Sequence, residues 1–189
     1  MKPHIRVLGV DDGPFTFAQK RCPFAGVMLR LPSYVEGAAF GSVVVDGTDS
    51  AERIAKMVRS SGWIPLLHAI LIDGAALAGF NLVDIERLNS TTGIPVITVT
   101  SDRPNPESIK AALRTHFEEW EERYEMLASR EIHEITAGDG VLYISFAGTD
   151  LKGAKEVVRA SIMKGYTPEP LRLAHMMARA FARSFDEFC

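Results

Sequence analysis

Two short apolar runs give the clearest structural signal in the chain. Residues 67–72 (LHAILI) end abruptly at Asp73-Gly74, and residues 94–100 (IPVITVT) are largely β-branched. Runs this apolar over so few residues are typical of strands that are buried on both faces, as in a parallel sheet. The pattern therefore predicts two buried strands.

The segment between these runs has the period of a helix. Leu82, Ile85 and Leu88 recur at three-residue spacing, and Gly93 follows where a helix is expected to end. A strand, a crossover helix and a second strand form a parallel unit. Asp73 stands at the carboxyl end of the first strand, which is the edge where open α/β sheets bind ligands.

The amino-terminal part of the chain predicts an antiparallel meander. Three short apolar stretches lie at 4–10, 26–31 and 38–45, and brief turn sequences separate them. A helix follows, with Asp49 or Ser50 at the position of its N-cap. This order places three antiparallel strands before the parallel unit.

The carboxyl-terminal part predicts further helices around a pair of strands. Residues 108–130 form one predicted helix, with Trp120, Tyr124 and Leu127 as its apolar stripe. The remaining elements are strands at 130–135 and 141–146 and helices at 150–163 and 170–182. The whole pattern predicts an α/β fold with a mixed sheet, in which three antiparallel strands are followed by parallel strands with flanking helices.

Composition narrows the class of protein. The 189 residues are 47% hydrophobic, enough to bury a core as a single domain spanning 1–189. The net charge of −3 gives no general attraction to nucleic acid, so a polyanion would have to meet a local basic patch or metal ions. Two cysteines make a disulfide framework improbable, and no stretch has the length of a signal peptide or membrane span, so we expect a cytoplasmic protein.

Acidic residues follow several of the predicted strands. They are Asp11 with its neighbour Asp12, Asp73, Asp150, and the pair Asp46 and Asp49 before the first helix. Carboxylates that gather at one sheet edge repel each other unless they share protons or bind a cation, and Mg²⁺ or Mn²⁺ is the natural partner. The simpler interpretation makes each acid a turn former or a helix cap.

Other reactive residue types give weaker signals. His68 lies in an apolar strand and His175 among apolar residues of the last helix, so both are predicted to be buried and hydrogen-bonded rather than catalytic. Cys22 follows Lys20-Arg21, whose charges could lower its pKa, but no base accompanies it. The sequence motifs of serine hydrolases, P-loop proteins and dinucleotide-binding proteins are absent.

Four segments together resemble a largely archaeal family of uncharacterised proteins distantly related to endonuclease V. They are RVLGVDDGPF at 6–15, SYVEGAAFGSVVVDGTD at 33–49, ILIDGAALAGFNLVDIERL at 70–88 and GYTPEPLRLAH at 165–175. The resemblance covers nearly the whole chain and implies a ribonuclease H-like fold. It also implies a divalent metal ion, Mg²⁺ or Mn²⁺, and DNA or RNA as the partner.

Endonuclease V itself is similar in order at three places: Gly9-Val10-Asp11, Asp73-Gly74 with the later Ile94-Pro95, and 168–174 (PEPLRLA). The resemblance implies that Asp11 and Asp73 hold metal with a further ligand near Asp150, and that Asp46 or Asp49 replaces the family's glutamate. Asp12, Tyr34, Gly74 and Arg172 are the expected substrate contacts, Tyr34 as a residue that stacks on or wedges apart the bases.

The departures from endonuclease V are equally specific. Tyr34 has lost the flanking prolines of the wedge, no His-Pro-Arg segment follows Asp73-Gly74, Ser101 replaces a lysine, and Thr149 replaces a histidine. Three hypotheses therefore stand at this point. The chain is a metal-dependent endonuclease, a nucleic-acid or nucleotide binding module without turnover, or a scaffold that kept only the fold.

Overall fold

The computed structural model describes the backbone of residues 5–188 and the side chains of residues 5–183, so the predicted strand residue His4 and the terminal Cys189 lie outside it. Within this part the strands are β1 (Arg6–Asp12), β2 (Arg21–Arg30), β3 (Tyr34–Val44), β4 (Ala69–Asp73), β5 (Ala76–Leu77), β6 (Asn81–Leu82), β7 (Val96–Thr100), β8 (His133–Ala137) and β9 (Gly140–Ala147). The helices are α1 (Ser50–Ser60), α2 (Ile85–Thr92), α3 (Pro106–His116), α4 (Trp120–Ala128), α5 (Leu151–Ala160) and α6 (Glu169–Phe188).

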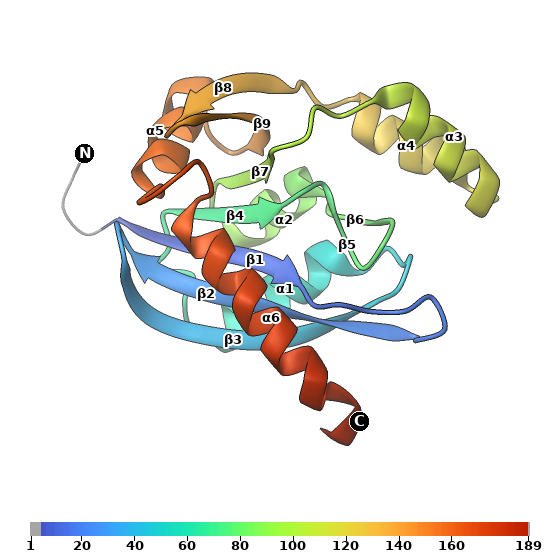
Figure 1. The fold of residues 1–189 in the computed structure, drawn as a ribbon, viewed down its shortest axis with the longest axis horizontal. Coiled ribbons are helices and arrows are strands. Elements are labelled where there is room, and N and C mark those ends of the chain that lie inside the picture. Colours follow the sequence, from blue (N-terminus) through green and yellow to red (C-terminus); the bar gives the residue numbers. More distant parts are fainter. Residues whose placement is uncertain (1–4, 189) are drawn as a thin grey trace.

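A mixed sheet organises the molecule (Figure 1). Its strand order is β3-β2-β1-β4-β7-β9-β8, and β5 and β6 form a separate small hairpin. Strands β1, β4 and β7 are parallel, whereas β2, β3, β8 and β9 join antiparallel to their neighbours. This arrangement confirms the predicted α/β fold, the antiparallel meander and the parallel unit around residues 67–100.

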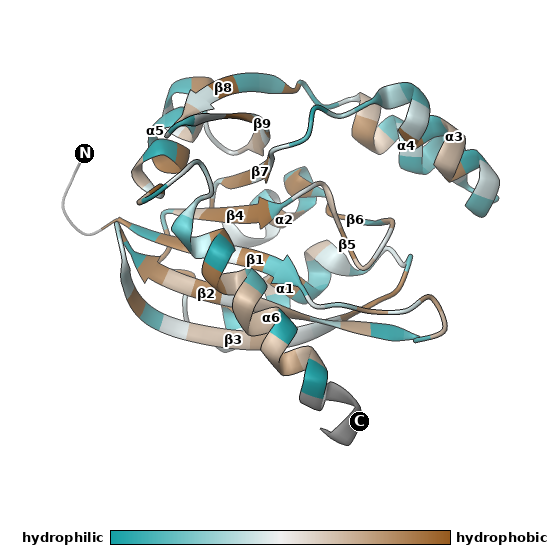
Figure 2. Cartoon of the chain, viewed as in Figure 1, coloured by the Kyte–Doolittle hydropathy of each residue, from teal (hydrophilic) through white to brown (hydrophobic). Residues whose placement is uncertain are grey.

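The alternation of side chains along β1 and β4 separates two cores. Leu8 and Ile70 face the helices α1 and α2, while Val7 and Leu71 pack with residues of α5 and α6. Figure 1 shows α6 crossing one face of β1, β2 and β3, and Figure 2 shows that the central strands β1 and β4 are mainly hydrophobic. Both faces of these strands are therefore covered, as their continuous apolar runs predicted.

Helix α6 lies so close to β1 that only glycine fits beneath its first turn. A Cβ atom on Gly9 would come within 2.2 Å of the backbone carbonyl carbon and oxygen of Pro170. We therefore expect Gly9→Ala to push α6 away from the sheet and to lower the free energy of unfolding by about 3 kcal/mol, as for an overpacked core. Denaturant unfolding measures this, and Gly62→Ala, where a Cβ meets open space but the backbone is left-handed (φ 70°), is expected to cost only about 1 kcal/mol. Equal stability of Gly9→Ala and wild type would contradict this packing.

Two predicted elements differ most from the observed ones. Strand β2 begins at Arg21 rather than at 26, so Cys22 lies in a strand instead of a loop. The predicted helix 108–130 is two helices, because Phe117 adopts an extended conformation (φ −132°, ψ 135°) between α3 and α4. These two helices form a hairpin that projects from the end of the sheet (Figure 1). No helix in the described part of the chain is both long and apolar enough to cross a bilayer.

Two arginines of this α3–α4 hairpin attach it to the body of the protein. Arg123 donates to the backbone oxygens of Asp46 (3.0 Å), Gly47 (3.3 Å) and Phe80 (2.8 Å). Arg130, just after α4, donates to the Val83 oxygen at 2.6 Å. The hairpin is therefore held over the segment that follows β4, beside the edge where the parallel strands end.

Candidate active site

Asp11 and Asp73 lie next to each other at the carboxyl ends of β1 and β4. The two strands are parallel, with Gly9 opposite Leu71 and Val10 opposite Ile72. One further residue along each strand brings Asp11 beside Asp73. Because side chains alternate between the faces of a sheet, both carboxylates point to the face that α6 covers. The strand register therefore brings these two acids together.

His175 of α6 completes this group. Its Nδ1 lies 2.7 Å from Oδ2 of Asp11, and its side chain is half exposed. The prediction of a buried structural histidine is wrong. Leu171, Ala174 and Ala178 form the buried face of α6, and His175 lies at its border, which turns the ring toward the end of β1.

Asp11 is held in an unfavourable environment for a carboxylate. It is only 5% exposed. Burial raises its pKa from 3.8 to about 7, the negative charges of Asp73 and Asp12 add to the rise, and the hydrogen bond with His175 opposes it. Proton sharing or a bound cation would relieve this repulsion, so Asp11 has the electrostatic signature expected of a functional site.

The pKa values of Asp73 and Asp12 are raised as well. Partial loss of hydration raises the pKa of Asp73. The charge of His175 opposes this effect and that of Asp12 reinforces it. Part of the Asp73 side chain is nevertheless exposed to solvent. Burial also raises the pKa of Asp12, but this carboxylate points to the other face of the sheet and accepts a short hydrogen bond from the Ala78 amide. Asp12 therefore holds the β5–β6 segment in place. Its carboxylate points away from the face that carries Asp11 and Asp73, so it does not have the position of the predicted substrate contact.

Asp150 does not join these acids, which corrects its prediction as a metal ligand and catalytic residue. Strand β9 runs antiparallel to β7, with Ala147 opposite Val96 at the beginning of β7. The residues after β9 therefore lie at the opposite edge of the sheet from Asp73. There the Asp150 carboxylate caps α5 by accepting a hydrogen bond from the Gly153 amide at 2.7 Å.

Asp46 and Asp49 lie at the same edge of the sheet as Asp11 and Asp73, but their carboxylates already accept hydrogen bonds from neighbouring residues. Asp46 accepts a hydrogen bond from the Phe80 amide at 2.8 Å. Asp49 accepts bonds from the Val44 amide (3.0 Å), the Asn81 side chain (2.8 Å) and Arg53 (3.0 Å). Although burial alone would raise the pKa of Asp49, these hydrogen bonds hold it below its ordinary value. Both residues stabilise the turn before α1.

The other expected substrate contacts occupy different positions. Tyr34 is exposed beneath the Arg30 guanidinium, 4.7 Å from its ring centre, at the edge where β1 begins, so it lies far from Asp11. Gly74 directly follows Asp73 and has a left-handed backbone (φ 72°). Arg172 lies one helical turn before His175 and pairs with Glu169 at 2.6 Å. Of the three, Gly74 directly adjoins one of the two acids, and Arg172 lies one helical turn from His175.

His68 and Cys22 take no part in this site. His68 is exposed rather than buried, and its Nδ1 accepts a hydrogen bond from the Arg6 amide at 3.2 Å. Cys22 is buried, and burial together with the charge of Asp12 raises its pKa to about 12, opposite to the lowering suggested by Lys20 and Arg21. A thiol that stays protonated is not a nucleophile.

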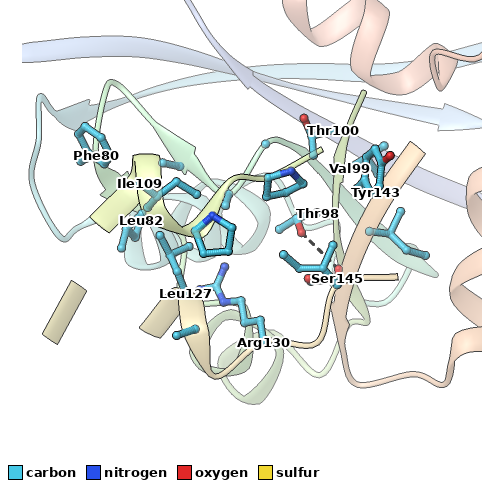
Figure 3. A pocket seen from close by; sticks show the side chains of 18 of the residues that line it. Phe80, Leu82, Thr98, Val99, Thr100, Ile109, Leu127, Arg130, Tyr143 and Ser145 are labelled. Atoms are coloured by element: carbon cyan, nitrogen blue, oxygen red, sulfur yellow. Dashed lines mark hydrogen bonds between the residues drawn. The ribbon is translucent and has the colours of Figure 1, made fainter. Parts of the chain in front are cut away.

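A cavity of about 500 Å³ opens beside Gly74, between the α3–α4 hairpin, the end of β7 and the middle of β9. Its walls are mainly apolar and include Leu82, Val99, Ile109, Leu127, Tyr143 and Ile144. Figure 3 shows these walls with the Thr98 hydroxyl and Arg130 among them. The buried Nη1 of Arg130 has no hydrogen-bond partner among the described residues, and burial lowers its pKa. No sequence motif marked this cavity, because the hairpin that forms it was expected to be one straight helix.

The side chains at this site provide only some of the ligands that a hard divalent cation requires. Within residues 5–183, no three His, Cys, Asp or Glu side chains are gathered so that they could hold a metal ion. Only the neighbouring carboxylates Asp11 and Asp73 lie together among the aspartates that were predicted as metal ligands. Mg²⁺ commonly binds proteins through one or two carboxylates and takes its other ligands from water and substrate phosphate, so this pair fits such an ion.

Known proteins resemble the chain over nearly its whole length. It is 39% identical over 185 residues to a UPF0215 protein of Thermococcus gammatolerans, covering 95% of this chain and 93% of that protein. A UPF0215 protein of Methanothermobacter thermautotrophicus is 39% identical over 180 residues, covering 94% of this chain and 88% of that one.

Solved structures extend the similarity. A protein of unknown function from Archaeoglobus fulgidus superimposes with a TM-score of 0.83 at 36% identity, over 94% of this chain and 98% of that one. Human endonuclease V gives a TM-score of 0.61 at 18% identity, over 97% and 86% of the two chains, which supports the ribonuclease H-like fold. The sequence profile of the family described as Endonuclease dU matches residues 3–182. The chain belongs to the Endonuclease dU family.

Proposed function

We propose that this protein is a divalent-metal-dependent endonuclease that cleaves phosphodiester bonds in DNA. The observation that supports the proposal best is the pair Asp11 and Asp73, brought side by side by the strand register with His175 bonded to Asp11. The raised pKa values of both carboxylates indicate a site that gains free energy by accepting positive charge.

Asp11 and Asp73 would hold Mg²⁺ or Mn²⁺, which supplies charge stabilisation at the phosphate and activates water. The hydrogen bond between His175 and Asp11 fixes the orientation of the Asp11 carboxylate, as second-shell partners do at metal sites. In the reaction, the oxygen of water would bond to phosphorus, the bond from phosphorus to one of its sugar oxygens would break, and a proton from the water would end on the departing sugar oxygen. His175 is half exposed and close enough to exchange a proton with water at this edge.

The cavity beside Gly74 supports a substrate with one base unstacked. Enzymes that act at a particular base commonly turn it out of the helix into a pocket. The cavity of about 500 Å³ adjoins the residue that follows Asp73, and it has the apolar walls suited to a planar base. The family description names dU, so we propose deoxyuridine-containing DNA as the first substrate to test.

Incision of labelled oligonucleotides tests this proposal. The substrates are matched DNA strands, single and double, that carry one deoxyuridine, one deoxyinosine or no altered base, and the corresponding RNA. We expect incision near deoxyuridine with Mg²⁺ or Mn²⁺ and none with EDTA. Absence of incision on every substrate with either ion would contradict the endonuclease proposal.

A binding module without turnover is the second candidate. The observation that favours it is that, among the described residues, the site gathers two carboxylates rather than a fuller set of ligands. Binding of the same oligonucleotides that weakens with salt, combined with intact strands after long incubation with Mn²⁺, would identify this alternative.

A further inference from the structure

Helix α6 carries an arginine stripe, formed by Arg172, Arg179 and Arg183. All three side chains are exposed. Their spacing of seven and four residues places them on one side of the helix. Leu171, Ala174 and Ala178 form the opposite, buried side of α6. The stripe therefore faces solvent along the helix that covers β1 and β2 (Figure 1).

The stripe is continuous with the acidic site. His175, which bonds to Asp11, follows Arg172 by three residues and precedes Arg179 by four. With a rise of 1.5 Å per residue, the stripe extends along the helix axis for about 16 Å. One strand of DNA carries a phosphate about every 3.4 Å, so this length corresponds to about five phosphates.

The outer part of the stripe has uncommitted positive charge. Elsewhere, Arg6 and Arg30 pair with Glu36, and Arg21 and Arg53 pair with Asp49. Arg172 pairs with Glu169. Within residues 5–183, the side chains of Arg179 and Arg183 make no hydrogen bond or ion pair, so their charge is available to a ligand.

Packing holds the outer part of the helix in place. The Phe181 ring stacks on Phe40 of β3, with ring centres 4.4 Å apart. A Cβ on Gly13 would come within 2.8 Å of the Ala178 oxygen and 2.9 Å of the Ala182 Cβ, so helix and loop are in close contact. The arginines therefore project from a fixed support, which reduces the entropy lost when they bind a ligand.

We infer that the arginine stripe binds the phosphate backbone of the DNA strand that enters the site at Asp11 and Asp73. The inference rests on the proposed function for its ligand, and on charge complementarity and continuity with the acids for its location. A chain with a net charge of −3 requires a local basic surface to hold a polyanion, and the stripe is such a surface.

Salt-dependent DNA binding tests the inference. Fluorescence anisotropy with a labelled duplex in EDTA, between 50 and 200 mM salt, would compare wild type with Arg179→Ala/Arg183→Ala. We expect affinity at 50 mM salt to fall by about tenfold or more, and the slope of log K against log salt to decrease by about 2. Both substitutions introduce a good helix former at exposed positions, so the melting temperature should change little.

The control is Arg59→Ala/Arg87→Ala, which removes the same charge from exposed positions on α1 and α2, across the sheet from α6. We expect near wild-type affinity and slope. Equal losses in both double variants, or no loss in the α6 variant, would overturn the inference. Because binding is measured without metal, this outcome is independent of whether the protein cleaves DNA: failure of cleavage alone leaves the binding result standing.

Discussion

Asp73→Asn is expected to reduce strand cleavage by about 10³-fold or more, while DNA binding in EDTA stays within about twofold of wild type. The amide has the shape of the carboxylate but lacks its charge, so the variant loses the proposed metal ligand without losing the fold. Its side chain is open to solvent, so the substitution leaves no buried group unpaired. Single-turnover cleavage with Mn²⁺ and anisotropy with the same duplex measure the two quantities.

Asp150→Asn is the matched control for this prediction. Both aspartates follow a strand, but Asp150 lies at the opposite edge and caps α5 through the Gly153 amide. Asparagine caps helices about as well as aspartate, so stability and cleavage should both remain near wild type. Full cleavage by Asp73→Asn, or loss of cleavage in Asp150→Asn, would show that the site has been assigned to the wrong edge.

This pair of aspartates also shows what sequence pattern can and cannot predict. The strands that carry Asp11 and Asp73 are buried on both faces, and their continuous apolar runs identify them locally. The residues around Asp150 do not indicate whether β9 runs parallel or antiparallel to β7. Asp150 therefore has the same sequence signature as Asp73 and a different position.

His175 was missed for a related reason. It meets Asp11 across 164 residues of sequence, through the packing of α6 on Gly9 and Gly13. The apolar neighbours of His175 predict a buried face correctly, but a residue at the border of that face can point either inward or outward. The resemblance in 165–175 included this histidine and was the available signal for it.

The break between α3 and α4 explains why the cavity could not be foreseen. Trp120, Tyr124 and Leu127 have helical spacing, and that spacing is preserved in α4. The extended backbone at Phe117 turns the chain back, and the rings of Phe117 and Phe80 meet with centres 5.6 Å apart. A tertiary contact therefore overrides a continuous helical pattern, and the hairpin that results forms one wall of the cavity.

A falling stability with rising pH is the second large effect that we expect, and Asp11→Asn should remove most of it. The pKa of Asp11 is about 7 in the folded protein against an ordinary value of 3.8, so between these values the folded chain binds a proton that the unfolded chain has lost. The contribution of Asp11 to stability is therefore greatest below about pH 4, decreases as the pH rises toward 7, and is level above it. The pKa shift of Asp11 corresponds to a change of roughly 4 kcal/mol at most in the free energy of unfolding.

Denaturant unfolding between pH 4 and pH 8 measures this effect, with Glu156→Gln, at an exposed position on α5, as a control of equal charge change. At pH 8, Asp11→Asn should be more stable than wild type, because it removes a buried negative charge and its repulsion with Asp73. Adding Mn²⁺ at pH 8 should raise the melting temperature of wild type and of Glu156→Gln but not of Asp11→Asn, since a ligand that binds only the folded state stabilises it. A wild-type stability that is flat across this range, or an Asp11→Asn variant that is less stable at pH 8, would mean that the acids do not form a strained cation site.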